Sequence, residues 1–213
     1  MKEKRKREKD KKQMWKPGNM LYPLPAVMVS CQRPKETPNI ITIAWAGTVC
    51  SSPAMVSISV RKERYSYAII RETGEFVVNL VTEGLAFAAD WCGVKSGRDV
   101  DKFKALNLTP QKMEHLSSPG IAESPVNLEC KVQQVIPLGS HDMFIAEIAG
   151  VMVDGACLDK QGKFHLNDAG LVAYSHGEYF TLGKKLGRFG YSVKKNPAGP
   201  AHGGLPGKKG ART

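Results

Sequence analysis

The residues best suited to chemistry lie in two neighbouring segments of the chain. Residues 39–53, NIITIAWAGTVCSSP, join an apolar run to small residues and paired hydroxyls. Residues 61–66, RKERYS, follow a second apolar run and place basic and hydroxyl side chains at the start of an expected helix. Basic side chains and helix-terminal amides bind phosphate, whereas small residues on a strand admit a flat ring. The pattern therefore predicts a cradle for a flat, phosphorylated ligand.

Each of these side chains also has an ordinary structural interpretation. Thr42 would place a hydroxyl beside the ring, but threonine is also a good strand former. The pair Ser51-Ser52 would add hydrogen bonds, but before Pro53 it also fits a simple turn. The basic side chains near Arg64 would hold phosphate, but isolated surface charges are usually solvated. Spacing alone leaves these alternatives open.

Short apolar runs separated by turn residues dominate the chain and must position these segments. Helical spacing is confined to residues 65–72 and 83–93. The connector LGSHD, residues 138–142, has the length of a hairpin turn. We predict strands over residues 26–31, 40–45, 55–60, 75–81, 126–137 and 143–153. Because strands and helices do not alternate regularly, an antiparallel barrel with helical inserts is favoured over a parallel sheet.

A second candidate binding segment follows the predicted helix at 83–93. Residues 94–103, VKSGRDVDKF, are polar, contain a glycine and carry Ser96, Arg98 and Lys102. Polar loops next to regular elements often carry binding residues. We expect this loop to contribute to the site, whereas the helix before it packs in the core.

The net charge of +11 belongs to the two ends of the chain. Residues 1–16 carry nine basic and three acidic side chains, residues 194–213 carry five and none, and residues 17–193 are neutral. We predict a basic arm over 1–16, one folded domain over 17–193 and a flexible Gly/Pro-rich tail over 194–213. Charge runs of this kind are usually solvated, so nucleic acid is not the expected partner. Neither a secretory apolar segment nor a membrane span of about 18 apolar residues is expected.

Cysteine and histidine spacing argues against disulfides and metal. The five cysteines are an odd number and form no CxxC pair, which fits free thiols in a cytoplasmic protein. The five histidines show no metal-ligand spacing, so no metal site is expected.

The order of motifs resembles the flavin reductase-like family, and its flavoredoxin branch most closely. The motifs are Asn39-x-x-Thr42-x-x-Trp45, then Ser51-Ser52-Pro53, then Arg64-Tyr65-Ser66, then GEFVVN at 74–79. The connector GSHDMFI at 139–145 is similar to the family's Gly-Asp-His turn, with Ser140 where aspartate is usual, and GKKLGRFG at 183–190 is similar to the flavoredoxin ending. The resemblance covers residues 20 to 193.

The resemblance implies a mainly β fold, an antiparallel split β-barrel of the Greek-key, FMN-binding type with a few short helices. It also implies a homodimer with FMN near the subunit interface. His141 would lie near the flavin and the nicotinamide, although a core histidine was the ordinary alternative. The implied FMN-binding residues are Asn39, Thr42, Ala44, Trp45, Cys50, Ser51, Ser52, Arg64, Ser66, Ser96, Gly97 and Lys102.

Two functions follow from the resemblance. In the first, the protein takes hydride from NADH or NADPH and passes it, or electrons, through FMN to an acceptor. In the second, it is an electron carrier that a partner protein reduces, with no nicotinamide site of its own. Neither function needs a covalent nucleophile, and Cys50 has no neighbouring cysteine to resolve a disulfide.

Overall fold

The structure is a computed structural model that describes residues 12–194. The chain divides into two units, Met1–Leu182 and Gly183–Thr213. The first unit contains every strand and α-helix of the described residues, and the second contains the short 3-10 helix η4 (Tyr191–Val193).

Most of the two predicted basic ends falls outside the described residues. The arm predicted over 1–16 is described only from residue 12, and the tail predicted over 194–213 only at its first residue. Both therefore stay predictions, as does the domain boundary predicted at residue 193.

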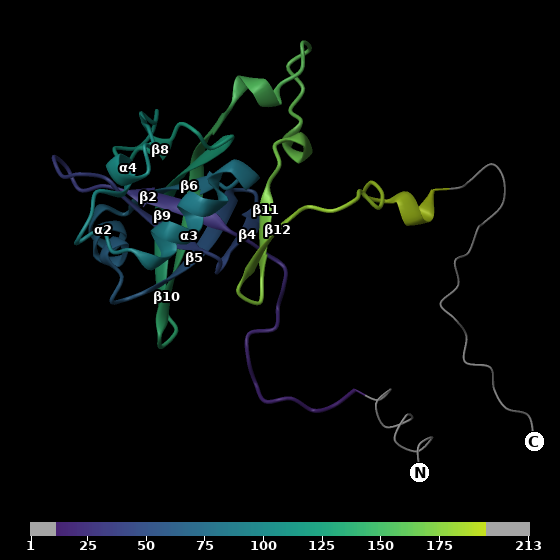
Figure 1. Cartoon of the computed structure of the whole chain (residues 1–213), viewed down its shortest axis with the longest axis horizontal. Helices are drawn as coiled ribbons and strands as arrows, with labels where there is room; N and C mark the ends of the chain where they lie inside the picture. Colours follow the sequence, from purple (N-terminus) through teal and green to yellow (C-terminus); the bar gives the residue numbers. More distant parts are fainter. Residues whose placement is uncertain (1–11, 195–213) are drawn as a thin grey trace, which may run out of the picture. The chain divides into compact units, whose positions relative to one another are not determined.

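Seven antiparallel strands form the main sheet, in the order β3-β2-β6-β9-β10-β5-β4. Figure 1 labels β2, β4, β5, β6, β9 and β10 of this sheet. Each neighbouring pair runs antiparallel. The strands are β2 (Val27–Cys31), β3 (Asn39–Ile43), β4 (Ala46–Ser51), β5 (Ala54–Arg61), β6 (Glu75–Leu80), β9 (Val126–Pro137) and β10 (His141–Val153). The sheet curls into a half-barrel, which confirms the prediction of a mainly β, antiparallel fold.

Two smaller sheets and a few short helices complete the first unit. The small sheets contain β1 (Leu24–Pro25), β11 (Val172–Ser175) and β12 (Glu178–Thr181), and separately β7 (Pro110–Gln111) and β8 (Gly120–Ile121). The helices are α2 (Tyr65–Thr73), α3 (Ala86–Val94) and α4 (Lys102–Ala105), with 3-10 turns η1 (Glu83–Leu85), η2 (Gly155–Cys157) and η3 (Leu166–Asp168).

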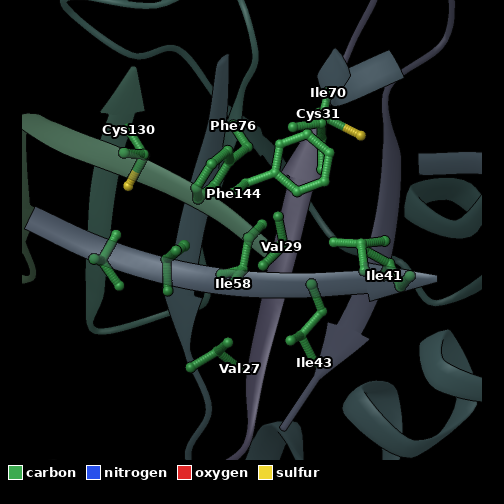
Figure 2. Packing of buried hydrophobic residues seen from close by; sticks show 14 of the residues in the cluster. Val27, Val29, Cys31, Ile41, Ile43, Ile58, Ile70, Phe76, Cys130 and Phe144 are labelled. Atoms are coloured by element: carbon green, nitrogen blue, oxygen red, sulfur yellow. The ribbon is translucent and has the colours of Figure 1, made fainter. Parts of the chain in front are cut away.

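The main core fills the inside of the curled sheet. Strand β5 reads AMVSISVR, and its alternate residues Val56, Ile58 and Val60 are buried there. Strand residues alternate between the two faces, so Met55, Ser57 and Ser59 lie on the opposite face of the sheet. Figure 2 shows Ile58 beside Val29, Phe76 and Phe144. Each of these four residues comes from a different strand of the sheet.

A second core cluster lies against the other face of β2 and β3. Met28 and Ile40 pack there with Ala89 of α3 and Phe103 of α4. Strand β2 is buried on both faces, which explains why its sequence is a continuous apolar run rather than an alternation. Helix α3 is thus fixed beside β3, next to the segment that the sequence identified first.

Residues 46–51, for which no strand was predicted, form strand β4. This edge strand pairs with β5 along its length, and the turn between the two comes only at Ser52-Pro53. The predicted strand over 40–45 ends correspondingly earlier, at Ile43. No residue of strand β4 is fully buried, and its sequence AGTVCS lacks the apolar alternation that identifies a half-buried strand.

The β9–β10 hairpin is tighter than the connector suggested. Strand β10 already begins at His141, which pairs with Arg61 of β5. Only residues 138–140 remain in the turn, where Gly139 adopts φ +90°. Since side chains alternate along β10, His141 shares a face of the sheet with Met143 and Ile145.

Candidate functional site

A cationic cavity of about 180 Å³ lies where β3, the start of α2 and the end of α3 meet. Four basic side chains, Arg64, Lys95, Arg98 and Lys102, line it together with a single carboxylate, Glu63. The remaining lining residues are Asn39, Ile41, Tyr65, Ser66, Cys92, Ser96 and Gly97. The excess of positive charge makes this cavity suited to a multiply charged anion.

The first turn of α2 adds to the positive character of the cavity. Arg64 is the N-cap residue of this nine-residue helix, and no side chain caps the helix or adds an acid in its first turn. Helix N-termini present unpaired backbone amides and the positive end of the helix dipole. The helix start and the basic side chains therefore favour the same kind of ligand.

Lys102 is held rigidly at the base of the cavity. Its side chain comes from α4, and the residue is only 3% exposed. The Nζ ammonium donates to the carbonyl oxygens of Ile40, at 2.6 Å, and Cys92, at 2.8 Å. An ammonium has three donors, so one remains for a ligand. Burial lowers the pKa of Lys102, and the nearby Arg64 guanidinium lowers it further.

Arg64 and Lys95 are the uncommitted cations of the cavity. Among the described residues, neither side chain has a hydrogen-bond or ion-pair partner. The two basic side chains that precede Arg64 are engaged elsewhere, because Arg61 pairs with Glu63 at 3.2 Å and Lys62 pairs with Asp142 at 3.3 Å. Of the three basic residues at 61–64, Arg64 is therefore the one available to bind a ligand in the cavity.

Gly97 lines the cavity at a position where a side chain would force Asn39 and Tyr65 to move. A Cβ at this residue would lie 2.0 Å from Asn39 Oδ1 and 2.9 Å from a Tyr65 ring carbon. Asn39 is itself fixed, since its Nδ2 donates to Ser66 Oγ at 2.7 Å. Cys92 in the same wall stays a neutral thiol, because burial raises its pKa to about 11.

A second cavity of about 590 Å³ lies at the start of β4, and we call it the Trp45 cavity. Ala46, Gly47, Ser57 and Ser59 line it from the strands, and residues 18–22 and Leu24 line it from the opposite side. The cationic cavity includes Ile41, only four residues before Trp45. The α-carbons of Ile41 and Trp45 are at most about 14 Å apart, because a fully extended chain spans ~3.6 Å per residue.

The structure brings six of the predicted binding residues together and disperses the others. Trp45 lies in its own cavity, and its carbonyl accepts from the Ser59 amide at 2.9 Å. The Thr42 hydroxyl donates to the Ala89 carbonyl, which joins β3 to α3. The Ala44 carbonyl accepts from the Ala46 amide at 3.0 Å. The six residues around the cationic cavity are Asn39, Arg64, Ser66, Ser96, Gly97 and Lys102.

The remaining predicted residues line neither cavity. Ser51 and Ser52 are exposed at the end of β4, and Cys50 is half-buried with its Sγ 3.5 Å from the Ser52 carbonyl oxygen. His141 is half-buried at the hairpin end, where its Nδ1 lies 2.9 Å from Ser140 Oγ.

The predicted set omits six of the twelve residues that line the cationic cavity, and four of these six stand next to predicted residues in the sequence. Lys95 and Arg98 flank the predicted Ser96-Gly97 pair, and Tyr65 sits between the predicted Arg64 and Ser66. Arg98 lies over the Tyr65 ring at 5.6 Å, and its Nη1 donates to the Glu63 carbonyl at 3.2 Å. The basic residues on both sides of the Ser96-Gly97 pair were the signal that could have identified Lys95 and Arg98.

Comparison with known proteins decides the family. The family model for the flavin reductase like domain matches residues 19–183. The chain belongs to the flavin reductase-like family. An uncharacterized protein of Archaeoglobus fulgidus is 32% identical over 161 residues, which cover 76% of this chain and 89% of that protein.

Solved structures of flavin reductase-like proteins agree with this assignment. Flavoredoxin of Desulfovibrio vulgaris (Miyazaki F) superposes with a TM-score of 0.80 at 33% identity, over 86% of this chain and all of flavoredoxin. Flavoredoxin of Methanosarcina acetivorans gives 0.77 at 26% identity, over 86% and 98% of the two chains. A putative flavin reductase with a split barrel domain from Shewanella frigidimarina NCIMB 400 gives 0.71 at 23% identity, over 79% and 86%. The predicted resemblance and the split-barrel fold are confirmed.

Two structural findings about residues 12–194 complete the description. No helix in this range is long and apolar enough to cross a membrane. Nor does this range contain a group of three or more histidine, cysteine, aspartate or glutamate side chains that could hold a metal ion.

Proposed function

We propose that this flavin reductase-like protein binds FMN with the flavin phosphate in the cationic cavity. The observation that carries the proposal is the group of four basic side chains, two of them uncommitted, around a small cavity at the start of α2. Phosphate carries two negative charges and accepts several hydrogen bonds, so it matches both the charge and the donors present. FMN itself is supported by a structural neighbour at 23% identity, an FMN-binding protein from Thermus thermophilus.

The isoalloxazine ring is assigned to the Trp45 side of β3. The ribityl chain joins phosphate to ring, and it would run along the Ile41–Trp45 segment, which links the linings of the two cavities. The Trp45 cavity offers small residues, Ala46 and Gly47, beside which a flat ring can lie. Thr42 at the end of β3 and Ala44 just after it would then contribute through the backbone. A ring-edge role for Cys50, Ser51 and Ser52 requires a ligand that reaches beyond the Trp45 cavity, because these residues do not line it.

When bound, FMN supplies the redox chemistry, because it accepts a hydride and passes electrons on. The protein binds and orients the cofactor. Arg64, Lys95 and Lys102 balance the phosphate charge, and Ser66 and the first amides of α2 donate hydrogen bonds to it. His141 is proposed to lie at the mouth of the ring site.

The electron source divides the proposal into two forms. In the preferred form NADH or NADPH donates hydride to the bound flavin, as the name of a neighbour with 20% identity, the NADH:FAD oxidoreductase SgcE6, suggests by analogy. In the alternative, a redox partner protein reduces the flavin, and the 33% identity to a flavoredoxin favours this form.

Anaerobic mixing separates the two forms. FMN-loaded protein is mixed with NADH and, separately, with NADPH while the flavin absorption band is followed. Bleaching by either nucleotide supports the reductase. A flavin band that persists with both nucleotides would exclude the reductase form and support the electron-carrier form. Failure of the protein to bind FMN at all would contradict both forms.

We also propose a homodimer whose interface includes the outer face of β5, β9 and β10. Met55, Ile136, Met143 and Ile145 share this face and are half-buried, although neither core cluster contains them. Ser57 and Ser59 belong to the same face and also line the Trp45 cavity. A second copy placed here would cover the apolar side chains and the proposed ring site together. Light scattering should then give twice the chain mass of 23.3 kDa.

The proposed compartment is the cytoplasm. All five cysteines are free in the structure, and reduced thiols are usual in that compartment. Cell fractionation tests this assignment, and recovery of the protein with oxidised, disulfide-bonded cysteines would contradict it.

A further inference from the structure

A third cavity, of about 320 Å³, lies in the loop that joins β10 to β11. It brings together one thiol, one imidazole and two carboxylates, and we call it the Cys157 cavity. Its lining residues are Ala156, Cys157, Leu158, Asp159, His165 and Asp168. None of them lines the cationic cavity or the Trp45 cavity, so the chemistry of these groups is separate from the proposed flavin site.

A small antiparallel hairpin places Cys157 directly opposite His165. Leu158 and Phe164 form an isolated antiparallel bridge, and the His165 amide donates to the Cys157 carbonyl at 2.8 Å. Residues directly opposite each other in such a pair hold their side chains on the same face, with Cβ atoms about 4.5–5.5 Å apart. The thiol and the imidazole therefore meet in the cavity from the two arms of the hairpin.

Asp159 fixes the ring of His165 through one of its two nitrogens. Its Oδ2 lies 2.8 Å from His165 Nε2, and this hydrogen bond lowers the pKa of Asp159. The ionised carboxylate only accepts hydrogen bonds, so the neutral ring carries its proton on Nε2 and a lone pair on Nδ1. Nδ1 is 3.8 Å from Asp168 Oδ2, beyond hydrogen-bond distance, and bonds to no other residue between 12 and 194. His165 can therefore accept a proton at Nδ1.

Cys157 is the cysteine best placed to react with a reagent from solution. Burial raises the pKa of three other thiols to about 11 or 12, which keeps them protonated: Cys31, Cys92 and Cys130. Cys50 is half-buried, but its Sγ lies 3.5 Å from the Ser52 carbonyl oxygen. Cys157 is also half-buried, and within residues 12–194 its thiol has no hydrogen-bond partner. It has both access and, across the hairpin, a histidine that can take its proton.

Thiol, imidazole and carboxylate thus take the places of nucleophile, base and orienting group in an activated-thiol site. Asp159 is the positioning residue, because it acts on the thiol only through the His165 ring. A thiolate exchanges reversibly with disulfides, and this reaction needs no further oxidant. The described lining holds no second cysteine that could displace the product.

The charge of the Cys157 cavity selects the reagent. Asp159 and Asp168 line it, whereas no lysine or arginine from the described part of the chain does. Two carboxylates repel anions and attract ammonium groups. A small disulfide that carries ammonium groups therefore matches both the nucleophile and the charge.

We propose that Cys157 is a site of reversible S-thiolation by small aminothiol disulfides, with His165 as the base. His165 Nδ1 takes the thiol proton, and the Cys157 thiolate attacks one sulfur of the disulfide. The new S–S bond forms as the old one breaks, and the released thiolate takes the proton back from His165. The disulfide itself is the oxidant. The product joins Cys157 to a small thiol and not to another cysteine of the chain.

Reaction of the full chain with cystamine, followed by intact-mass spectrometry and peptide mapping, tests the proposal. We expect Cys157 to be modified at least about tenfold faster than Cys50, because a positioned base contributes about 10²–10⁴ to a rate. Below the ordinary thiol pKa of about 8.5, the rate at Cys50 should fall about tenfold per pH unit. The rate at Cys157 should persist there, since His165 removes the proton.

Two variants assign the roles. His165→Gln removes the base, so the rate at Cys157 and its pH dependence should become those of Cys50. Asp159→Asn keeps the Oδ1 that accepts from the Gln161 and Lys163 amides, but it presents an amide to Nε2 and so reverses the ring tautomer. The rate should fall and its pH dependence change, while the thermal unfolding midpoint stays near that of wild type. His176→Gln, in a different hairpin turn, is the matched control and should change neither rate nor pH dependence.

Several outcomes would overturn the inference. They are modification of Cys50 as fast as Cys157, and a wild-type rate and pH dependence in His165→Gln. Oxidised glutathione, a disulfide with net negative charge, should react with Cys157 about tenfold more slowly than cystamine. Equal rates would contradict the preference for ammonium groups. If a variant does not fold, the two cysteines and the two disulfides compared in wild type still decide the question.

Discussion

At the scale of single residues, the cations of the proposed phosphate site differ in what holds them. Lys102 is buried and donates to two backbone carbonyls, so its removal would disturb β3 and α3 as well as ligand binding. Arg64 makes no such contact, although it stands at the same cavity. Arg64 is therefore the residue whose substitution reports on the ligand alone.

Arg64→Ala should weaken FMN binding at least tenfold, because a charge-assisted phosphate contact contributes about 1.5–3 kcal/mol. The Kd is measured by quenching of flavin fluorescence. Arg61→Ala is the matched control, since Arg61 belongs to the same basic run but pairs with Glu63. Equal losses in the two variants would contradict the phosphate assignment.

Gly97→Ala should disturb the fold and the site together. The added Cβ would lie 2.0 Å from Asn39 Oδ1, so Asn39 must move away from Ser66. We expect a loss of about 1–3 kcal/mol in the free energy of unfolding, as for other overpacked sites, measured by urea denaturation. Gly155→Ala, where a Cβ meets nothing within 4 Å, should cost far less. If Gly97→Ala is as stable as wild type, Asn39 and Tyr65 can move to accommodate the added methyl group without cost.

At the scale of the elements, Asp142 ties the start of β10 to α2 and to the end of β5. Its buried carboxylate accepts from Tyr67 at 2.6 Å and pairs with Lys62 at 3.3 Å and Arg71 at 3.6 Å. The Tyr67 hydrogen bond, followed by Lys62 and Arg71, holds the pKa of Asp142 below its ordinary value of 3.8. These contacts fix α2, whose first turn forms part of the cationic cavity, against the sheet.

Asp142→Asn should lower the thermal unfolding midpoint by a few degrees at pH 7, because the ion pairs are lost. A carboxylate with a lowered folded pKa stabilises the protein fully above its unfolded pKa, and that contribution disappears as the pH falls through the folded value. The difference between wild type and variant should therefore shrink below pH 3.8. Circular dichroism at pH 7 and at acid pH measures both midpoints.

Asp168→Asn serves as the control for this titration, since the Asp168 side chain is 81% exposed. Its midpoint should follow that of wild type at both pH values. If the unfolding midpoint of Asp142→Asn lies below that of wild type by the same amount at neutral and acid pH, the charge of the Asp142 carboxylate is not what stabilises these contacts.

At the scale of the whole molecule, the outer sheet face decides whether one chain forms a complete site. The proposed ring site and the apolar side chains Met143 and Ile145 lie on the same face. If a second copy covers this face, dimerisation and flavin binding are coupled, because both remove the same surface from water.

Ile145→Arg should convert the proposed dimer to a monomer and weaken FMN binding, since a guanidinium in the interface lacks a partner. Light scattering measures the mass and fluorescence quenching the affinity. Gln161→Arg adds the same charge in an exposed turn and should change neither. A dimer that survives Ile145→Arg with unchanged affinity would place the interface elsewhere.

The sequence by itself determined the sheet-forming runs and the composition of the site. Strand β5 is identified by its alternation, and α2 is identified by Gly74, which adopts φ +69° at the helix end and donates to the Ile70 carbonyl. Basic and hydroxyl residues at 64–66 likewise indicated a phosphate site, and the polar loop at 94–103 indicated a second binding segment. Such signals are local, because each depends on neighbouring residues and on backbone geometry that they set themselves.

Only the tertiary structure decided which of these residues meet. Arg61, Lys62 and Arg64 are equivalent in the sequence, but Glu63 and Asp142 occupy the first two and leave Arg64 to the cavity. Thr42 matched a ring-facing hydroxyl, but its partner is a helix carbonyl 47 residues later. Strand β4 was missed because none of its residues is fully buried, so its sequence shows no apolar alternation. Each outcome depends on contacts between distant segments, which form only when the sheet curls and brings α2 and α3 to the end of β3.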